Sequence, residues 1–236
     1  MQVCPQPPAS RCRVLRVIRE AELARPEVRL EDWDGQLVVV KDYSVRAARL
    51  KLQISRFLVQ REYAAHARLQ GLQGVADAIL SANPHTFVRA YVPGDPAPEV
   101  PQRLTGEFFQ RLRAVILAVH RRAVAHGDLK RLQNILVQPD GSPALVDFSA
   151  AIISGSNPLA ALLLAYMQDD DLRAIAKLKA RHAPHLLSDE DLTLLGQRSL
   201  CERAWRWVRA YPRHWIQSRS DAYSCRVGHA QDDDAL

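Results

Sequence analysis

The sequence predicts an α+β protein built as two lobes, a β-rich N-lobe followed by a mainly helical C-lobe. Short apolar runs bounded by turn residues fill the first part of the chain, whereas apolar residues recur at helical spacing after Ser149. A proline-rich loop between these parts, with Pro96, Pro98 and Pro101, is the expected linker. The expected divisions are a disordered N-terminus (1–12), an N-lobe (13–94), a C-lobe (95–218) and a flexible tail (219–236).

The composition excludes several classes of protein. Of the 236 residues, 47% are hydrophobic and 25% are charged, as in ordinary globular proteins. The longest nearly uncharged apolar stretch, Pro158–Met167, is far shorter than the roughly 20 residues that span a bilayer, so we expect no transmembrane helix. The N-terminus has no basic start followed by an apolar run, which predicts a cytoplasmic protein whose four cysteines are reduced thiols. The close histidine pair His182 and His185 lacks a nearby carboxylate or thiol and does not predict a zinc site.

The strands of the N-lobe are predicted from apolar runs that end at turns. Val28–Tyr43 reads as two β-runs joined by Asp34-Gly35, a strong hairpin signal because glycine tolerates the positive φ that such turns need. The second run carries Lys41 near its end. A further run, Thr86–Val92, ends at Pro93-Gly94.

Helices are predicted where apolar residues recur every three or four positions without proline or glycine. Residues 47–69 meet this criterion, and this helix carries Glu62. A second helix begins around Leu104 and ends near His120–Ala125.

Two acidic motifs in the C-lobe flank short β-runs. The motif AHGDLKRLQN (125–134) precedes the run Ile135–Val137, and the run Ala144–Val146 ends at Asp147. Pro139-Asp140-Gly141 joins the two runs as a turn. Taken alone, the first motif is a polar loop and Asp147 is a turn cap. A catalytic role for either is inferred only from the order of all these elements.

That order resembles the protein-kinase-like phosphotransferases over most of residues 28–150. A strand with Lys41, a helix with Glu62, a linker, a long helix, the His126-Gly127-Asp128 motif and a strand that ends at Asp147 follow one another as they do in that superfamily. The resemblance implies a bilobal protein-kinase-like fold with a reduced C-lobe, and an ATP-dependent kinase that uses Mg²⁺ or Mn²⁺.

The resemblance also implies where the nucleotide binds. Lys41 would hold the α- and β-phosphates, and Glu62 would pair with its ammonium group and fix its direction. The adenine would lie against the backbone of Ala90, Tyr91 and Val92.

The remaining implied roles belong to catalysis and the metal. Asp128 would accept the proton of the attacking hydroxyl, and Lys130 would neutralise the γ-phosphate. Asp147 and Asn134 would give oxygen ligands to the metal. Five residues separate Asp128 from Asn134, one more than in the protein-kinase pattern, so Gln133 is an alternative metal-facing residue. We favour Asn134 because it directly precedes the apolar strand.

The sequence departs from the protein-kinase pattern at several points. Residues 14–34 contain no glycine, so the usual Gly-rich loop is missing and phosphate binding would rest more on Lys41 and the metal. Gly127 replaces the arginine of His-Arg-Asp, Ser149 replaces the glycine of Asp-Phe-Gly, and no Ala-Pro-Glu motif follows. We therefore expect no control by activation-loop phosphorylation. This reduced pattern looks like the RIO-type kinases and the bacterial lipopolysaccharide-core sugar kinases, including the Kdo and heptose kinases.

The basic charge is concentrated near the C-terminus. Between Leu172 and Arg219 ten lysines and arginines face four acids, which accounts for the formal net charge of +6. A helix from Leu200 would carry Arg203, Arg206, Arg209 and Arg213 on one side. Two interpretations of these residues stay open: a helix packed on the C-lobe with its arginines in water, or peripheral docking on an anionic membrane surface at the cytoplasmic face of the inner membrane. Without a nucleic-acid motif, we expect no nucleic-acid partner.

Three functions remain open at this level. The main interpretation is a kinase that phosphorylates a sugar hydroxyl of the lipopolysaccharide inner core. The first alternative is a RIO-like serine/threonine kinase with a protein acceptor, since either acceptor presents a hydroxyl to Asp128. The second is a nucleotide-binding pseudokinase scaffold, which the missing Gly-rich loop and the shifted Asn134 favour.

Overall fold

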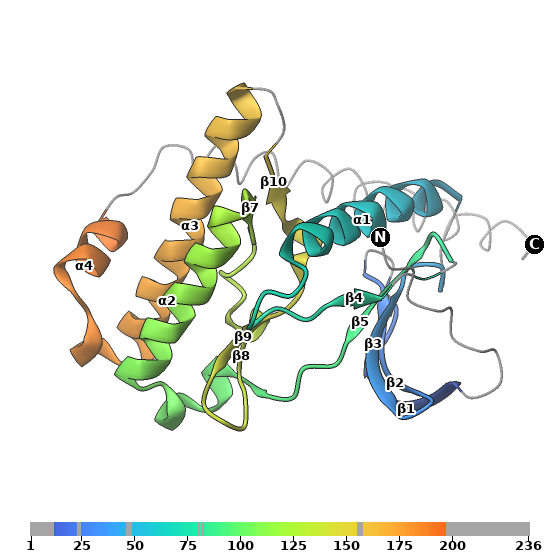
Figure 1. The fold of residues 1–236 in the computed structure, drawn as a ribbon, viewed down its shortest axis with the longest axis horizontal. Coiled ribbons are helices and arrows are strands. Elements are labelled where there is room, and N and C mark those ends of the chain that lie inside the picture. The colour runs from blue at the N-terminus through green and yellow to red at the C-terminus, as the bar shows by residue number, and fades with distance from the viewer. Residues whose placement is uncertain are drawn as a thin grey trace, which may run out of the picture. The chain divides into compact units, whose positions relative to one another are not determined.

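A five-stranded sheet forms the N-terminal part of the computed structural model, which describes residues 12–22, 25–45, 49–79, 81, 83–154 and 158–196. The strands are β1 Cys12–Arg19, β2 Glu27–Trp33, β3 Gln36–Asp42, β4 Ala78–Ile79 and β5 Thr86–Ala90. They lie in the order β1-β2-β3-β5-β4, and each neighbouring pair is antiparallel. Figure 1 shows this sheet as the β-rich part of the fold.

The predicted hairpin joins β2 to β3. Trp33 pairs with Gln36, which leaves Asp34 and Gly35 as a two-residue loop. Their φ values are 53° and 90°, the left-handed conformation that the tightest hairpin turns need at both central residues. Lys41 lies near the end of β3, as the sequence predicts.

Strand β1 is a feature that the sequence analysis misses. Its apolar residues Val14, Leu15, Val17 and Ile18 are 42–50% exposed, so no alternation of buried and exposed positions marks the strand. Its pairing with β2 also shifts register twice.

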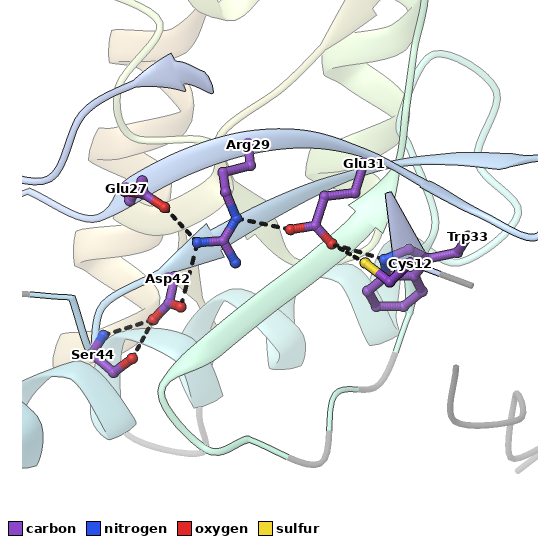
Figure 2. Close-up of polar contacts among 7 residues, drawn as sticks. All are labelled: Cys12, Glu27, Arg29, Glu31, Trp33, Asp42 and Ser44. Carbon is purple, nitrogen blue, oxygen red and sulfur yellow. Dashed lines mark hydrogen bonds and ion pairs between the residues drawn. The ribbon is translucent and has the colours of Figure 1, made fainter. Parts of the chain in front are cut away.

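Polar side chains on β2 form a connected group that also contacts Cys12 of β1, as Figure 2 shows. Glu31 accepts hydrogen bonds from the Cys12 thiol at 3.0 Å, from Trp33 Nε1 at 2.8 Å and from Arg29 Nε at 2.8 Å. Arg29 also pairs with Glu27 and, at 3.6 Å, with Asp42 on β3. Burial and the Glu31 carboxylate raise the pKa of Cys12, which is a free thiol. The other three cysteines lie outside the described residues.

Helix α1, Arg49–Leu69, packs against one face of this sheet. Val59 on the helix, Phe87 on β5 and Tyr43 after β3 form a buried cluster. Phe87 and Lys41 pair across neighbouring strands, so the face of the sheet that meets α1 also carries Lys41. The helix confirms the expectation over residues 49–69, and residues 47 and 48 lie outside the described residues.

The second part of the fold is mainly helical, as expected. Its helices are α2 Gly106–Arg121, α3 Pro158–His182 and α4 Asp189–Gly196. Thr105 caps α2 by accepting a hydrogen bond from the Phe108 N–H. One apolar core joins α2 and α3 to the end of α1 through Leu112, Leu178 and Leu69. Short 3₁₀ helices cover Ala97–Glu99, Pro101–Arg103, Leu132–Asn134, Phe148–Ala150 and Pro184–Leu186.

Two small sheets complete this part. Strands β6 Asp95–Pro96, β8 Ile135–Val137 and β9 Pro143–Leu145 form one, and β7 Val124–Ala125 pairs with β10 Ile152–Ile153 in the other. The last pair corrects one expectation, because the strand β10 precedes the helical region expected directly after Ser149. Two-residue strands leave no periodicity in a sequence, which explains the difference. The helix before the His126 motif ends at Arg121, within the expected range.

Arginines connect α1 to the second part of the fold. Arg68 Nη2 donates to the Ser154 carbonyl at 3.0 Å, and Arg122 Nη1 donates to the carbonyls of Arg68 and Gln70, each at 2.9 Å. Arg61 donates to the Ser149 carbonyl. These bonds fix the helix that carries Glu62 against the segment that follows Asp147.

Several expectations concern residues that the structure does not describe. Contacts group residues 1–195 into one unit and 196–236 into a second. The basic helix from Leu200 and the flexible tail (219–236) lie outside the described residues, as does the N-terminus up to residue 11. The lobe boundaries remain predictions. Among the described helices, none combines the length and the apolar character required to cross a bilayer.

Candidate active site

Lys41 joins the two parts of the fold through two carboxylates. Its Nζ lies 2.6 Å from Glu62 Oε1 on α1 and 2.7 Å from Asp147 Oδ1, which follows β9. Lys41 is 5% exposed and Glu62 is fully buried. The structure thus brings together three predicted site residues that lie far apart in the sequence.

Burial and charge act against each other in this cluster. Burial alone would lower the pKa of Lys41, but the Asp147 and Glu62 carboxylates outweigh it and raise that pKa. Burial would raise the pKa of Asp147, yet the Lys41 ammonium holds it well below its usual range. For Glu62, burial prevails over Lys41 and the pKa rises. Asp147 is therefore an anion at neutral pH, as a metal ligand must be.

Two members of this cluster, Lys41 and Asp147, line a cavity of about 330 Å³. Its lining includes the predicted residues Lys41, Asn134 and Asp147. The other lining residues lie on the strands β1, β2, β3 and β5 and directly before Asp147. They are Ile18, Arg19, Val28, Val39, Arg89 and Val146. Arg19 and Arg89 are not predicted by the sequence analysis. The sequence signal for Arg89 was its position as the one charged residue inside the apolar run Thr86–Val92.

The residues predicted to contact adenine do not line the cavity, unlike Lys41, which is predicted to contact the phosphates. The N–H groups of Ala90 and Tyr91 donate to Asp77 O and Leu37 O, both at 2.9 Å. The Ala90 carbonyl accepts from Arg89 Nη1 at 2.9 Å. None of Ala90, Tyr91 and Val92 lines the cavity, although Val92 packs against its wall residue Val146.

Asp171 on α3 holds the start of the catalytic loop. This buried carboxylate accepts hydrogen bonds from the N–H groups of His126 at 2.7 Å and Gly127 at 3.0 Å. It also lies 3.2 Å from His120 Nε2. The sequence analysis misses Asp171, although three consecutive aspartates (169–171) within an otherwise apolar segment were a visible signal.

Gly127 is required by the shape of this loop. Its φ is 74°, and a Cβ at this position would lie 2.6 Å from the Ala150 carbonyl oxygen. No other residue fits without moving the backbone. This explains why the arginine of the usual motif is replaced.

Asn134, rather than Gln133, faces the cavity. Asn134 is 6% exposed and lines the cavity, whereas Gln133 is exposed. Asn134 Nδ2 donates to the Asp128 carbonyl at 3.1 Å, which leaves the amide oxygen Oδ1 as the group available to a cation. The Asn134 carbonyl also accepts from Val146 N–H at 3.0 Å, next to Asp147.

The donor atoms of this site fit Mg²⁺. Asp147 and Asn134 offer a carboxylate and an amide oxygen, and Mg²⁺ is usually held by one or two carboxylates together with substrate phosphates and water. Among the described residues, no cluster of three or more histidine, cysteine or acidic side chains forms a separate metal site. The metal would thus depend on the nucleotide for part of its coordination.

Asp147 lies in a strained backbone conformation. Its φ of 67° and ψ of 66° are left-handed, which costs a non-glycine residue about 1–3 kcal/mol. Phe148, the next residue, is fully buried between two histidine rings, with centroid distances of 4.5 Å to His126 and 5.2 Å to His66. This packing holds the strained segment in place.

Asp128 and Lys130 form ion pairs with residues outside the Lys41 cluster. Asp128 Oδ2 is 3.4 Å from Arg131 Nε. Lys130 Nζ is 3.1 Å from Asp170 Oδ1, so α3 supplies its counter-charge. Neither residue lines the cavity. The sequence analysis does not anticipate Asp170.

Comparisons with known proteins give one family and two similar solved structures. The family model described as RIO domain matches residues 36–191. The structure is similar to the Rio2 kinase-ADP/Mg²⁺-phosphoaspartate complex from Chaetomium thermophilum, with 21% identity, a TM-score of 0.55, and coverage of 75% of this chain and 58% of that chain. It is also similar to another structure of the Rio2 kinase from Chaetomium thermophilum, with 21% identity, a TM-score of 0.56, and coverage of 79% and 65%.

The same comparisons confirm the expected protein-kinase-like fold. The chain spans less than two thirds of the length of each Rio2 structure. No curated protein matches the sequence.

Proposed function

Because the chain belongs to the RIO domain family, we propose that it is an ATP-dependent phosphotransferase that phosphorylates a serine or threonine hydroxyl of a protein. The observation that supports this function best is the contact of Lys41 with both Glu62 and Asp147 in a cavity that Asn134 also lines. The family favours the protein acceptor over the lipopolysaccharide sugar, which was the main interpretation of the sequence and gains no support.

Lys41 and its partners would bind the phosphates of ATP. Glu62 is fully buried and fixes the direction of the ammonium group, while Asp147 is partly accessible and is free to exchange Lys41 for a metal. The nucleotide phosphates would then replace Asp147 as partners of Lys41. Bound Mg²⁺, held by Asp147 and Asn134, would neutralise the charge of the phosphates.

Asp128 would act on the acceptor hydroxyl. The hydroxyl oxygen forms a bond to the γ-phosphorus while the bond between that phosphorus and the β,γ-bridging oxygen breaks, and the hydroxyl proton passes to the Asp128 carboxylate. The hydrogen bond from Asn134 to the Asp128 carbonyl couples the position of this residue to the metal site. Lys130 would leave Asp170 to approach the γ-phosphate.

Labelled phosphate transfer tests this function. The full chain is incubated with γ-labelled ATP, Mg²⁺ and casein as a generic protein acceptor, beside the variant Asp147→Asn and the control Asp140→Asn. Asp140 lies in the exposed turn between β8 and β9, so the control makes the same chemical change outside the site. We expect labelled casein with the wild type and the control, and a loss of at least about a hundredfold with Asp147→Asn.

Three outcomes would contradict the proposal. Equal transfer by Asp147→Asn would remove Asp147 from the mechanism, and no transfer by the wild type would favour the scaffold alternative. Label on the chain itself that hydroxylamine removes would indicate an aspartyl phosphate, the group named in the Rio2 complex, and would overturn the protein acceptor. The membrane contact of Arg203, Arg206, Arg209 and Arg213 and the cytoplasmic location remain predictions.

A further inference from the structure

Arg89 is a buried cation that the proposed mechanism does not use. It lies in the middle of β5 and is 9% exposed. Its Nη1 donates to the Ala90 carbonyl at 2.9 Å, whereas its buried Nε has no hydrogen-bond partner. Within the described part of the chain, no carboxylate lies within 4.0 Å of its guanidinium group, as an ion pair would require.

The strand register directs Arg89 toward the nucleotide cavity. Arg89 pairs with Val39, and Phe87 pairs with Lys41, so these four side chains share one face of the sheet. Arg89, Val39 and Lys41 all line the cavity. Arg89 and Lys41 therefore line the same cavity from the same face of the sheet.

Burial of this cation is unfavourable without a ligand. A charged group removed from water without a paired carboxylate costs several kcal/mol. Burial lowers the pKa of Arg89, and the more distant Glu62 and Asp147 carboxylates offset only part of this effect. A ligand that accepts hydrogen bonds from the guanidinium group would offset the unfavourable free energy of burying this charge.

The contact with Ala90 indicates which ligand group this is. The adenine is expected against the backbone of Ala90, whose carbonyl already accepts a hydrogen bond from the Arg89 guanidinium. The amino group of adenine is a donor and accepts no hydrogen bond from Arg89. Guanine and hypoxanthine instead carry the O6 oxygen beside N7, and this pair of acceptors matches the parallel donors of an arginine.

We propose that Arg89 binds the O6 and N7 edge of a 6-oxopurine, so that the cavity accepts guanine and hypoxanthine nucleotides as well as the adenine nucleotide. This inference rests on the proposed function, because it assumes that a nucleotide occupies the cavity. Arg89 is then a specificity residue, and Lys41, Asn134 and Asp147 serve every nucleotide alike.

Calorimetric titration of the full chain with GDP, IDP and ADP, each with Mg²⁺, tests the proposal. Wild type, Arg89→Met and Arg89→Lys are compared with the control Arg29→Met. Arg29 pairs with Val40 and so lies on the opposite face of the same sheet, where its loss would weaken the sheet without reaching the cavity. Lysine keeps the charge but lacks the planar pair of donors.

For the wild type and Arg29→Met we expect measurable binding of GDP and IDP. In Arg89→Met and Arg89→Lys, the Kd for GDP and IDP should rise about tenfold or more while the Kd for ADP changes little, since a bidentate arginine–base contact is worth about 1–3 kcal/mol. An equal loss for all three nucleotides would assign Arg89 to the phosphates or to the fold, and would overturn base recognition. Binding of ADP without GDP or IDP to the wild type would overturn it too.

A second measurement needs no variant. The diphosphate of 2,6-diaminopurine riboside differs from GDP in the replacement of O6 by an amino group and in the loss of the N1 proton. We expect it to bind the wild type about tenfold more weakly than GDP, and equal affinity would contradict the role of Arg89. If the wild type binds none of these nucleotides and transfers no phosphate from ATP, the proposed function itself has failed.

Discussion

Lowering the pH from 7 to 5 should destabilise the protein through His66. This residue of α1 is 3% exposed, and its ring contacts Phe87 and Phe148 at centroid distances of 5.1 and 5.2 Å. Nδ1 lies 2.8 Å from the Ala76 carbonyl, whereas the buried Nε2 has no hydrogen-bond partner. A protonated ring would therefore bury a positive charge.

The size of the effect follows from the pKa of His66. Burial lowers this pKa from 6.5 to about 4; the Ala76 carbonyl opposes the shift, and Lys41, Arg89 and His126 add to it. Because the folded pKa lies below the unfolded one, the unfolded state binds more protons between these values. The stability is fully present above pH 6.5 and is lost as the pH falls toward 4. The whole shift corresponds to about 3 kcal/mol, of which about 2 kcal/mol is lost between pH 7 and 5.

Urea unfolding at pH 7, 6 and 5 measures this loss. The variant His66→Phe keeps an aromatic ring without a titrating group, and the control His185→Phe makes the same change at an exposed residue. Between pH 7 and 5 the wild type and the control should lose about 2 kcal/mol more than His66→Phe. All other titrating groups are common to the wild type and His66→Phe and cancel in that comparison. Equal losses in wild type and His66→Phe would refute the reasoning.

Three further predictions concern the candidate active site. Lys41→Met should lower the free energy of unfolding by about 3–5 kcal/mol, because it leaves Glu62 without its cation, and Lys41→Met/Glu62→Gln should recover much of that loss in urea unfolding. Asp128→Ala should bind ATP like the wild type in calorimetry but transfer labelled phosphate about a hundredfold more slowly; unchanged transfer would remove Asp128 from the mechanism. Asn134→Ala should raise the Mg²⁺ concentration needed for half-maximal transfer, whereas Gln133→Ala should not, and the reverse result would make Gln133 the metal-facing residue.

The sequence predicted the elements whose conformation is determined by residues that are close together in the chain. The Asp34-Gly35 hairpin needs two left-handed residues, and the helix of α1 needs a continuous run without proline or glycine, so both can be recognised from the sequence. The order of Lys41, Glu62 and Asp147 in the sequence predicted that they belong to one site. Only the fold brings the carboxylate oxygens of Glu62 and Asp147 within 2.7 Å of Lys41 Nζ.

The features that were missed depend on tertiary contacts. Strand β1 is held by its backbone pairing with β2 and by the contact of Cys12 with Glu31, rather than by a buried face of its own. Lys130 is paired with Asp170, a residue whose role depends on where α3 packs. Arg89 lies in an apolar run whose register decides whether it meets solvent or the cavity. None of these contacts has a fixed spacing in the sequence.

The support of the catalytic loop by Asp171 has a consequence for the synthesis of the protein. Asp171 lies 45 residues after His126, so a ribosome completes every residue of the proposed nucleotide and metal sites before it makes the carboxylate that holds the loop. A nascent chain that stops before α3 would contain Lys41, Asp128 and Asp147 but no anchor for the loop between them. Catalytic competence would then arise late, when α3 packs, and premature termination before α3 would release fragments that cannot transfer phosphate.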